Sequence, residues 1–346
     1  MSAAVPDDRM IGPLDFSRRQ ALGVGLGAAS SLALGGAARA DAKRVDIVMT
    51  QGNTGLIVHE VARAQGFFDQ FAISPDVLQV SDGSKCVAAL VSGASQLCIY
   101  SGFNQLTPAL ERGAPLKILA GALNLPSVAM FSGHPNIQRV ADLRGKVLGI
   151  GAPGSVLHQM TVLLLRKKGV DPNSVTFRNV GSNADVFKAV AAKTVDAGLS
   201  DIEVWNKAAG YGAHALPDGL CWKEIPEYTN QASYASVSAI QRDRDGLVRA
   251  LAAYGKAYRY ISSPASRDAY VRARQKVTGQ GDAQAALAQW NWIQQNHPYD
   301  TGLILSQTQV DTVQKLDVEF KVQRQVLPFN QITDMSIARD ALKLIK

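Results

Sequence analysis

The chain has 346 residues, which is enough for two domains of ordinary size. Hydrophobic residues make up 47% and charged residues 19%, a composition that is typical of globular proteins and excludes a disordered chain. The net charge of +7 comes from scattered basic residues, without long runs or interleaved aromatic residues. We therefore expect no nucleic-acid partner.

The N-terminus has the features of an export signal. The twin-arginine pattern Ser17-Arg18-Arg19-Gln20-Ala21-Leu22 precedes a weakly apolar, Gly- and Ala-rich stretch over 21–37, and Ala38 and Ala40 offer small residues to a signal peptidase. The stretch is too short and too rich in glycine for a good permanent span. We predict a signal peptide over 1–40 and a periplasmic protein exported by the twin-arginine route. The alternative is a flexible or membrane-anchoring N-terminus.

Strand and helix patterns alternate after the signal. Each expected strand is short and apolar on both faces, as a strand covered by helices on both sides must be. Such alternation favours mostly parallel sheets with right-handed crossovers. The expected strands of the first part are 45–50, 77–80, 97–100, 117–120 and 127–131, and its expected helices are the segment before Gly66, Ser84 to Val91 (opened by a serine cap) and Asn104 to Arg112.

The pattern then repeats about 100 residues later. The strand 147–150, a glycine-rich turn and a helix up to Lys168 correspond to the first strand, turn and helix, and 186–200 corresponds to 85–100. We predict two similar lobes joined by two crossing strands, 127–131 and 234–240, with a loop over 217–230. Lobe one comprises 41–129 and 238–346, and lobe two comprises 130–237. From Asp243 onward the chain is mostly helical, and this tail is expected to pack on lobe one.

The cysteines indicate no metal or cofactor site. Cys86 and Cys98 lie in consecutive elements of one lobe, and either a disulfide or two buried free thiols is consistent with their spacing. Cys221 has no further partner. The chain contains no C-x-x-C and no metal-like spacing of Cys and His, so we expect no metal and no cofactor.

A cleft between two such lobes is a place to bind a small molecule. In doubly wound sheets, ligands lie outside the carboxyl ends of the strands, where helices begin. That rule selects loops rich in Gly, Ser and Asn, whose backbone and short side chains can approach a ligand. The candidate ligand-binding residues are Gln51, Asn53, Thr54, Asp82, Ser84, Ser101, Phe103, Gly154, Ser155, His158, Asn183, Asp201 and Trp205.

Several candidates also suit a purely structural role. Ser84 and Ser155 fit helix caps, and Asp82 fits an ordinary turn. Phe103 and Trp205 are able to stack on a planar ligand but are equally suited to the core. His158 lies one turn into its helix, where it either faces the cleft or stays partly buried. Both roles stay open for each residue at this point.

The expected ligand is a small organic solute whose charge the sequence leaves open. The cleft loops contain no arginine, and Lys85 is the one basic residue close to them. A carboxylate or sulfonate is often held by a bidentate arginine. The ligand is therefore either an anion held by helix N-termini and neutral donors, or a neutral or amine-bearing planar compound held by aromatic residues and aspartates. We favour the second.

Four stretches together resemble a known family. Ala64-Gln65-Gly66-Phe67-Phe68, the segment 142–149 (DLRGKVLG), the segment 164–172 (LLRKKGVDP) and Val195-Asp196-Ala197 are similar, in order and spacing, to motifs of bacterial ABC-transporter substrate-binding proteins of the nitrate/sulfonate/taurine and thiamine-precursor type. The last motif departs at Lys193-Thr194, where the family has glycine. The resemblance covers about 45–240 and is weaker in the C-terminal helices.

The resemblance implies an α/β fold of the two-lobed, type II periplasmic-binding kind. Each lobe would be a mixed, mostly parallel sheet flanked by helices, with two hinge strands that let the lobes close over a solute. It also implies delivery of the solute to an ABC permease in the membrane. We expect a monomer that is not an enzyme. The alternatives are a ligand-binding sensory module, or an enzyme on the same fold similar to a suicidal pyrimidine synthase, whose cysteine-rich motif this chain lacks.

Overall fold

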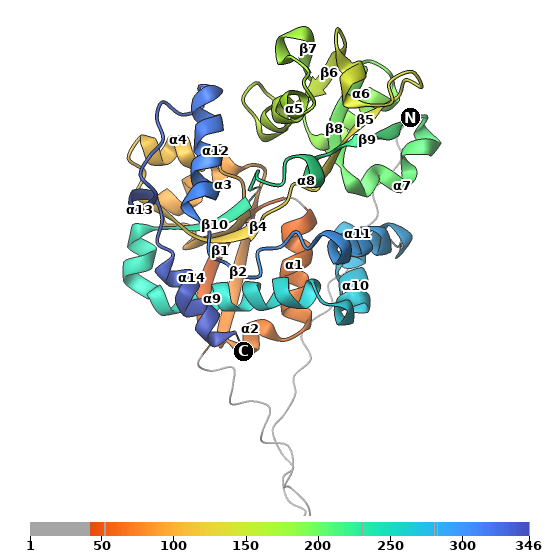
Figure 1. Cartoon of the computed structure of the whole chain (residues 1–346). Coiled ribbons are helices and arrows are strands. Elements are labelled where there is room, and N and C mark those ends of the chain that lie inside the picture. Colours follow the sequence, from red (N-terminus) through yellow and green to blue (C-terminus); the bar gives the residue numbers. More distant parts are fainter. Residues whose placement is uncertain (1–41, 52, 230, 280, 282, 346) are drawn as a thin grey trace, which may run out of the picture. The chain divides into compact units, whose positions relative to one another are not determined.

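The computed structural model describes residues 42–51, 53–229, 231–279, 281 and 283–345. Within this part the chain forms two five-stranded sheets, each flanked by helices (Figure 1). The predicted signal peptide lies outside the described residues. Both sheets belong to one unit of the chain, which reaches to its C-terminus.

The first sheet is mixed. Its β1 pairs in parallel with β2 and β3, whereas β10 runs antiparallel between β3 and β4. Four of the five strands therefore run in one direction, as predicted. In spatial order the strands are β2 (Ile73–Val80), β1 (Lys43–Thr50), β3 (Leu97–Ser101), β10 (Gln231–Ser236) and β4 (Leu116–Leu123).

The second sheet repeats this arrangement. Its β6 pairs in parallel with β7 and β8, and β5 runs antiparallel between β8 and β9. In spatial order the strands are β7 (Thr176–Asn179), β6 (Val147–Ile150), β8 (Ala197–Asp201), β5 (Val128–Ser132) and β9 (His214–Leu220). The predicted internal repeat is thus a repeat of sheet topology, and the predicted two-lobed fold is confirmed.

The prediction that the strands 127–131 and 234–240 cross between the lobes is wrong. β10 lies wholly within the first sheet and ends at Ser236, and β5 lies wholly within the second sheet. The chain passes between the sheets in 124–127, and again after α8 (Cys221–Glu224). The expected loop over 217–230 holds the end of β9 and all of α8. The division into lobes at 129/130 and 237/238 stays a prediction.

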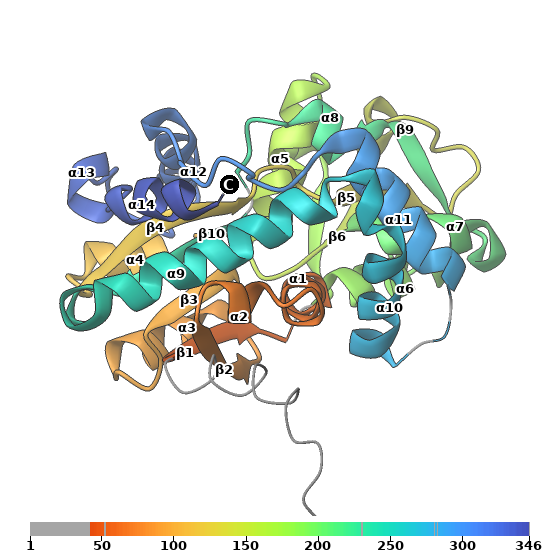
Figure 2. The same cartoon turned by 90° about the horizontal axis from the view of Figure 1, so that it is seen from below.

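The first sheet is covered on both faces. One core cluster packs α1, α9 and α14 on it, and another packs α3, α4 and α12 on the opposite face. In Figure 2, α9 runs along the sheet and α14 lies beside it, consistent with their extensive contact. The helices are α1 (Asn53–Ala64), α2 (Phe67–Gln70), α3 (Gly83–Val91), α4 (Leu106–Glu111), α9 (Val237–Ile261), α10 (Arg267–Thr278), α11 (Ala283–Asn296), α12 (Gln307–Glu319), α13 (Phe329–Ile332) and α14 (Ser336–Leu344).

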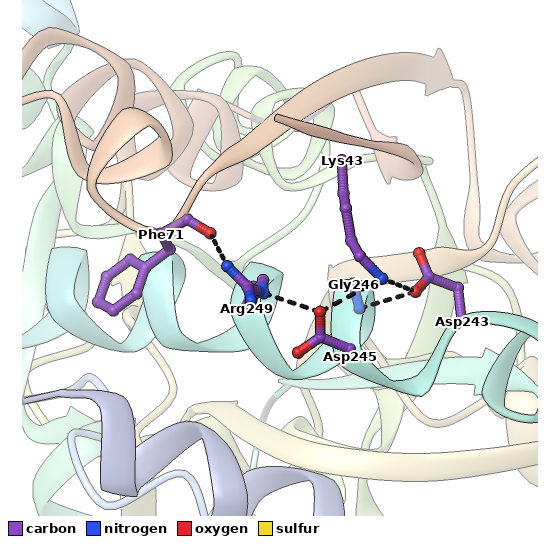
Figure 3. A network of polar contacts seen from close by, with 6 residues as sticks. All are labelled: Lys43, Phe71, Asp243, Asp245, Gly246 and Arg249. Atoms are coloured by element: carbon purple, nitrogen blue, oxygen red, sulfur yellow. Dashed lines mark hydrogen bonds and ion pairs between the residues drawn. The ribbon is translucent and has the colours of Figure 1, made fainter. Parts of the chain in front are cut away.

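Helix α9 restarts after its first turns, and polar contacts join the restart to β1 (Figure 3). Asp243 has non-helical dihedrals (φ −147°, ψ 64°), and its carboxylate accepts a hydrogen bond from the backbone N–H of Gly246 at 3.0 Å. The same carboxylate accepts from Nζ of Lys43 at 2.8 Å. Asp243 therefore acts as a second N-cap within α9 and anchors the first strand to it.

Two helices of the second lobe, α5 and α6, begin with side-chain caps. Ser155 accepts from the backbone N–H of His158, and Ser182 forms a capping box with Asp185. Side chains of the C-terminal segment also reach this lobe, since Leu316 and Trp292 pack on its core. The tail therefore packs on both lobes, and not on lobe one alone. The helices are α5 (Val156–Lys167), α6 (Asn183–Ala191), α7 (Trp205–Ala208) and α8.

The three cysteines are free thiols, and all are buried. Of the alternatives open for Cys86 and Cys98, the structure therefore shows the unpaired one. Among the described residues, no helix is long and apolar enough to cross a membrane.

Candidate functional site

A cavity of about 260 Å³ lies between the two sheets. Its lining comes from the ends of strands and the first turns of helices in both lobes, as the position of ligands in doubly wound folds predicts. On the side of the first sheet, which we call the lobe-one wall, the lining residues are Thr50, Thr54, Gly83, Tyr100, Ser101, Gly102, Gln105, Leu123 and Gln231. The remaining lining residues are Ser127, Val128, Val156, Leu157, Met160, Asn183 and Asp201.

The lobe-one wall is polar and partly without hydrogen-bond partners. The hydroxyl of Ser101 and the side-chain carbonyl of Gln231 are buried and make no hydrogen bond with any described residue. Buried polar groups of this kind favour a ligand that supplies the missing partner. Beside them, Tyr100 adopts φ of 64°, a left-handed conformation that is uncommon for a residue with a side chain and that is found more often at functional sites.

The lobe-two wall contains one carboxylate, that of Asp201 at the end of β8. The side-chain amide of Asn183 donates to its Oδ1 at 2.7 Å, and Ser200 Oγ holds the backbone carbonyl of Asn183 at 2.8 Å. Burial raises the pKa of Asp201 to about 6; the hydrogen bond from Asn183 opposes this rise, and the nearby charge of Glu203 adds to it. Asp201 is therefore mostly ionised at neutral pH, and no basic residue of the described lining neutralises its charge.

The rest of the lobe-two wall is apolar, from the first turns of α5. Val156, Leu157 and Met160 supply it. None of the lining residues in the described chain is a lysine or an arginine. The cavity thus offers apolar surface, neutral hydrogen-bonding groups and a single negative charge.

Four of the predicted site residues line the cavity: Thr54, Ser101, Asn183 and Asp201. Their binding of a ligand stays a prediction. The side chain of Asn53, at the start of α1, lies outside the described residues. Gln51 is exposed and follows the lining residue Thr50.

Other predicted residues lie next to the lining but serve the helices. Asp82, and not Ser84, caps α3 by accepting from the backbone N–H of Lys85, and both side chains are exposed. Ser155 caps α5, so its hydroxyl is already bonded. Gly154 donates its N–H to Nδ1 of His158 at 3.0 Å and contacts the C-terminal segment.

Three predicted residues point elsewhere because apolar contacts hold them. Phe103 is buried in the core under α3 and α4. The ring of His158 lies against Phe177 and Phe320, and burial lowers its pKa. Trp205 lies on the surface of lobe two, 40% exposed. None of the three lines the cavity, and of the two roles left open for Phe103 the structure shows the core one.

Several lining residues come from strands and from the segment between the lobes, where the sequence has no pattern typical of a binding site. Tyr100, Leu123, Val128 and Gln231 lie within or at the ends of strands that read as ordinary apolar segments. Met160 was open to prediction, since it lies four residues after Val156 on the same face of α5. The others depend on how the two sheets face one another.

A second pocket of about 600 Å³ lies between lobe two and α11. Its wall holds three tryptophans, Trp205, Trp222 and Trp292. The rings of Trp222 and Trp292 meet edge to face, with centroids 5.4 Å apart. This pair joins α8 of lobe two to a helix of the C-terminal segment. No group of His, Cys, Asp or Glu among the described residues is arranged to hold a metal ion.

A family model and many solved structures match this chain, and the solved structures have the same two-lobed fold. A family model described as NMT1/THI5 like matches residues 53–265. No curated protein matches the sequence. Among solved structures, the periplasmic aliphatic sulphonate binding protein SsuA from Escherichia coli matches with a TM-score of 0.69 and 16% identity, over 84% of this chain and 92% of that one.

Two further solved structures show the range of proteins with this fold. The periplasmic nitrate-binding protein NrtA from Synechocystis PCC 6803 matches with a TM-score of 0.65 and 10% identity, over 88% of this chain and 90% of that one. The desulfurization enzyme DSZB matches with a TM-score of 0.61 and 16% identity, over 87% of this chain and 99% of that one. At such identities the likeness establishes the fold, which is that of periplasmic binding proteins.

Proposed function

The chain belongs to the NMT1/THI5-like family, and from this premise we propose that it is an extracytoplasmic solute-binding protein. It captures a small organic molecule in the cavity between its lobes and delivers it to an ABC importer in the membrane. The observation that carries the proposal is the cavity itself, which is lined from both lobes by strand ends and helix starts. Solved binding proteins for sulfonate and nitrate with the same fold support it.

The cavity favours a neutral or amine-bearing ligand over a sulfonate or nitrate. Asp201 is the one charged residue in the lining, and no basic residue of the described lining opposes it. An anion about 4 Å from this carboxylate would be repelled by about 4 kcal/mol at an effective dielectric constant of 20. An ammonium or amidine group in the same place would be attracted by a similar amount, and its N–H groups would meet the free acceptor of Gln231.

The alternative is an anion held by helix N-termini. The starts of α3, α5 and α6 all contribute lining residues: Gly83, Val156 and Asn183. Their backbone N–H groups and dipoles favour negative charge by about 0.3–1 kcal/mol each at exposed sites. This attraction is smaller than the repulsion from an ionised Asp201 nearby, so the amine-bearing or neutral class is preferred. The cavity volume suits a compound smaller than a typical drug-sized ligand.

The proposed setting is the periplasm, reached by the twin-arginine route from the predicted signal over 1–40. We further propose that the protein acts as a monomer and not as an enzyme. The fold it shares with a desulfurization enzyme keeps an enzymatic role as the alternative. Release of a changed product from any bound compound would overturn the proposal of a pure binding protein.

A ligand panel tests the proposal directly. Melting temperature is measured with primary amines, aminated and neutral heterocycles, alkanesulfonates and nitrate, for the wild type and for the Asp201→Asn variant. We expect amines or neutral heterocycles to raise the melting temperature and sulfonates and nitrate not to do so. Native mass spectrometry of freshly purified protein adds any solute that stays bound. No response to any compound, with no bound solute, would contradict the proposed function.

Importer and sensory roles are separated by partners, since both use the same cavity. Genes for a permease and an ATPase beside this one, and loss of solute uptake on its deletion, support the importer. A neighbouring signalling protein together with unchanged uptake would instead support the sensory module.

A further inference from the structure

A buried arginine of the C-terminal segment forms an ion pair with a carboxylate of lobe two. Arg274 on α10 has a side chain only 4% exposed, and its Nη2 lies 3.2 Å from Oε2 of Glu203. Its Nε donates to Oε1 of Gln289 on α11 at 3.0 Å, and Nε2 of Gln289 donates to Oε1 of Glu203 at 2.9 Å. The three side chains therefore form a closed ring in which each contacts the other two.

The lobe-two member of this ring lies next to the ligand site. Glu203 lies in the 3₁₀ turn Ile202–Val204, two residues after Asp201. Both of its carboxylate oxygens accept hydrogen bonds from the C-terminal helices. The turn begins directly after the end of β8 at Asp201. A contact that fixes the position of Glu203 therefore also restrains the backbone of Asp201.

The ring has the geometry of a specific contact. A guanidinium group presents several N–H donors in a rigid plane, so it fixes orientation as well as charge. Burial removes the water that would otherwise solvate the two charges. The pair is therefore stable only when its partners keep good hydrogen-bond geometry. If the lobes move apart, Glu203 leaves both partners at once, since Arg274 and Gln289 move with α10 and α11.

We propose that Arg274 is a positioning residue of the binding cavity, which acts through Glu203 to hold the lobes together and to orient the strand end that presents Asp201. Its consequence for ligand capture rests on the proposed function. The contact itself joins two parts of the protein and requires no ligand, so it is testable on the protein alone.

A pair of tryptophans provides a spectroscopic signal for this contact. The edge-to-face pair of Trp222 and Trp292 spans the same two parts, because Trp292 lies on α11 close to Gln289. Separation of the lobes would part the two rings and change their fluorescence and near-ultraviolet circular dichroism. A Trp292→Phe variant identifies the share of the signal that comes from this pair.

The test compares Arg274→Gln with Arg272→Gln, which removes the same charge from an exposed position on the same helix. Without ligand, we expect Arg274→Gln to increase the radius of gyration in solution scattering and to lose the tryptophan-pair signal. Arg272→Gln should leave both unchanged. Arg274→Lys should restore part of the compaction, because it keeps the charge facing Glu203 but loses the bond to Gln289.

A second variant keeps the proposal testable if Arg274→Gln does not fold. Glu203→Gln changes a side chain that is 23% exposed, and it should reproduce the effect of Arg274→Gln, with no further change in the double variant. Wild-type radius and tryptophan signal in Glu203→Gln and in folded Arg274→Gln would overturn the proposal. Since no ligand is used, this outcome differs from a failure to find any solute.

Discussion

The carboxylate of Asp317 on α12 accepts a hydrogen bond from the side-chain amide of Gln159 on α5, with Oδ1 and Nε2 2.7 Å apart. Its other oxygen accepts from the hydroxyl of Thr107 on α4 at 2.6 Å. All three side chains are buried. A single carboxylate of the C-terminal segment therefore bonds a helix of each lobe.

Removal of this carboxylate should destabilise the protein. Asp317→Ala leaves one N–H of the Gln159 amide buried without its acceptor, which costs about 1–3 kcal/mol, whereas the hydroxyl of Thr107 keeps the carbonyl of Phe103 as an acceptor at 3.2 Å. We expect a loss of about 1–3 kcal/mol in the free energy of unfolding, measured by urea denaturation. Asp317→Asn is the matched control, because it keeps one acceptor oxygen and should lose less. Equal stability of Asp317→Ala and wild type would contradict this role.

Ionisation of Asp317 should make the stability of the protein depend on pH. Burial raises the pKa of Asp317, and the hydrogen bonds from Thr107 and Gln159 oppose the rise. The folded state therefore holds this proton to a higher pH than the unfolded state does. Its contribution to stability is present below the ordinary carboxyl pKa of about 4 and declines as pH rises through the folded value. Relative to Asp317→Asn, wild-type stability should fall with rising pH in this window; a rise would refute the prediction.

The charge of Asp201 should control ligand affinity. A hydrogen bond to a charged group contributes about 1.5–3 kcal/mol, so Asp201→Asn should weaken binding of the best amine by about 10- to 100-fold in calorimetry. In the wild type, affinity for that amine should decline as pH falls through about 6, the pKa of Asp201. A neutral heterocycle serves as the control ligand, with little dependence on either change. Undiminished amine affinity in Asp201→Asn would count against the proposed ligand class.

Asn183 should hold this pKa down. Its amide bonds the carboxylate of Asp201 at 2.7 Å and so stabilises the ionised form. In Asn183→Ala we expect the pKa of Asp201 to rise above about 6, as followed by NMR titration of the labelled carboxyl carbon. Asn179→Ala, at an exposed position of β7, is the control and should leave the titration unchanged. An unmoved titration in Asn183→Ala would show that the bond does not set this pKa.

A methyl group at Gly198 should disturb the strand that presents Asp201. A Cβ there would meet Cγ1 of Val186 at 2.4 Å and the carbonyl of Gly149 at 2.9 Å. Overpacking of this kind typically costs about 1–3 kcal/mol, which we expect for Gly198→Ala in thermal or urea unfolding. Gly210→Ala is matched to it, since no atom lies within 4 Å of the added carbon, and should be nearly neutral. Similar stability of the two variants would contradict the packing of β8.

The cap at Asp243 should matter more than its ion pair. Asp243→Ala removes the acceptor for Gly246 N–H, and loss of an N-cap costs about 1 kcal/mol. Lys43→Ala removes a partner whose side chain is 41% exposed, and an exposed ion pair contributes less than about 1 kcal/mol. Chemical denaturation should therefore show the larger loss for Asp243→Ala. The reverse order would mean that the ion pair, and not the cap, holds this junction.

Much of the fold was open to prediction because it is local. Short apolar segments between glycine-rich turns identify β1, β3 and β6 within a residue or two, since periodicity and turn chemistry depend on neighbours in the chain. The boundary at Ser236 was missed because a strand and the helix that follows it are both apolar there. Asp82 and Ser84 both suit a cap, and the backbone alone decides that Asp82 takes the position.

The amino-acid order by itself determined the repeated strand–turn–helix units, the family resemblance, the capping of α5 by Ser155, and the placing of Asn183 at a helix start and of Asp201 at a strand end. These depend on interactions within a few residues. Only the tertiary structure decided that Gln231 lines the same cavity as these two residues, that Phe103 turns inward, and that Arg274 reaches Glu203. Such pairs lie far apart in the chain, and it is the packing of two sheets and a returning C-terminal segment that brings them within bonding distance.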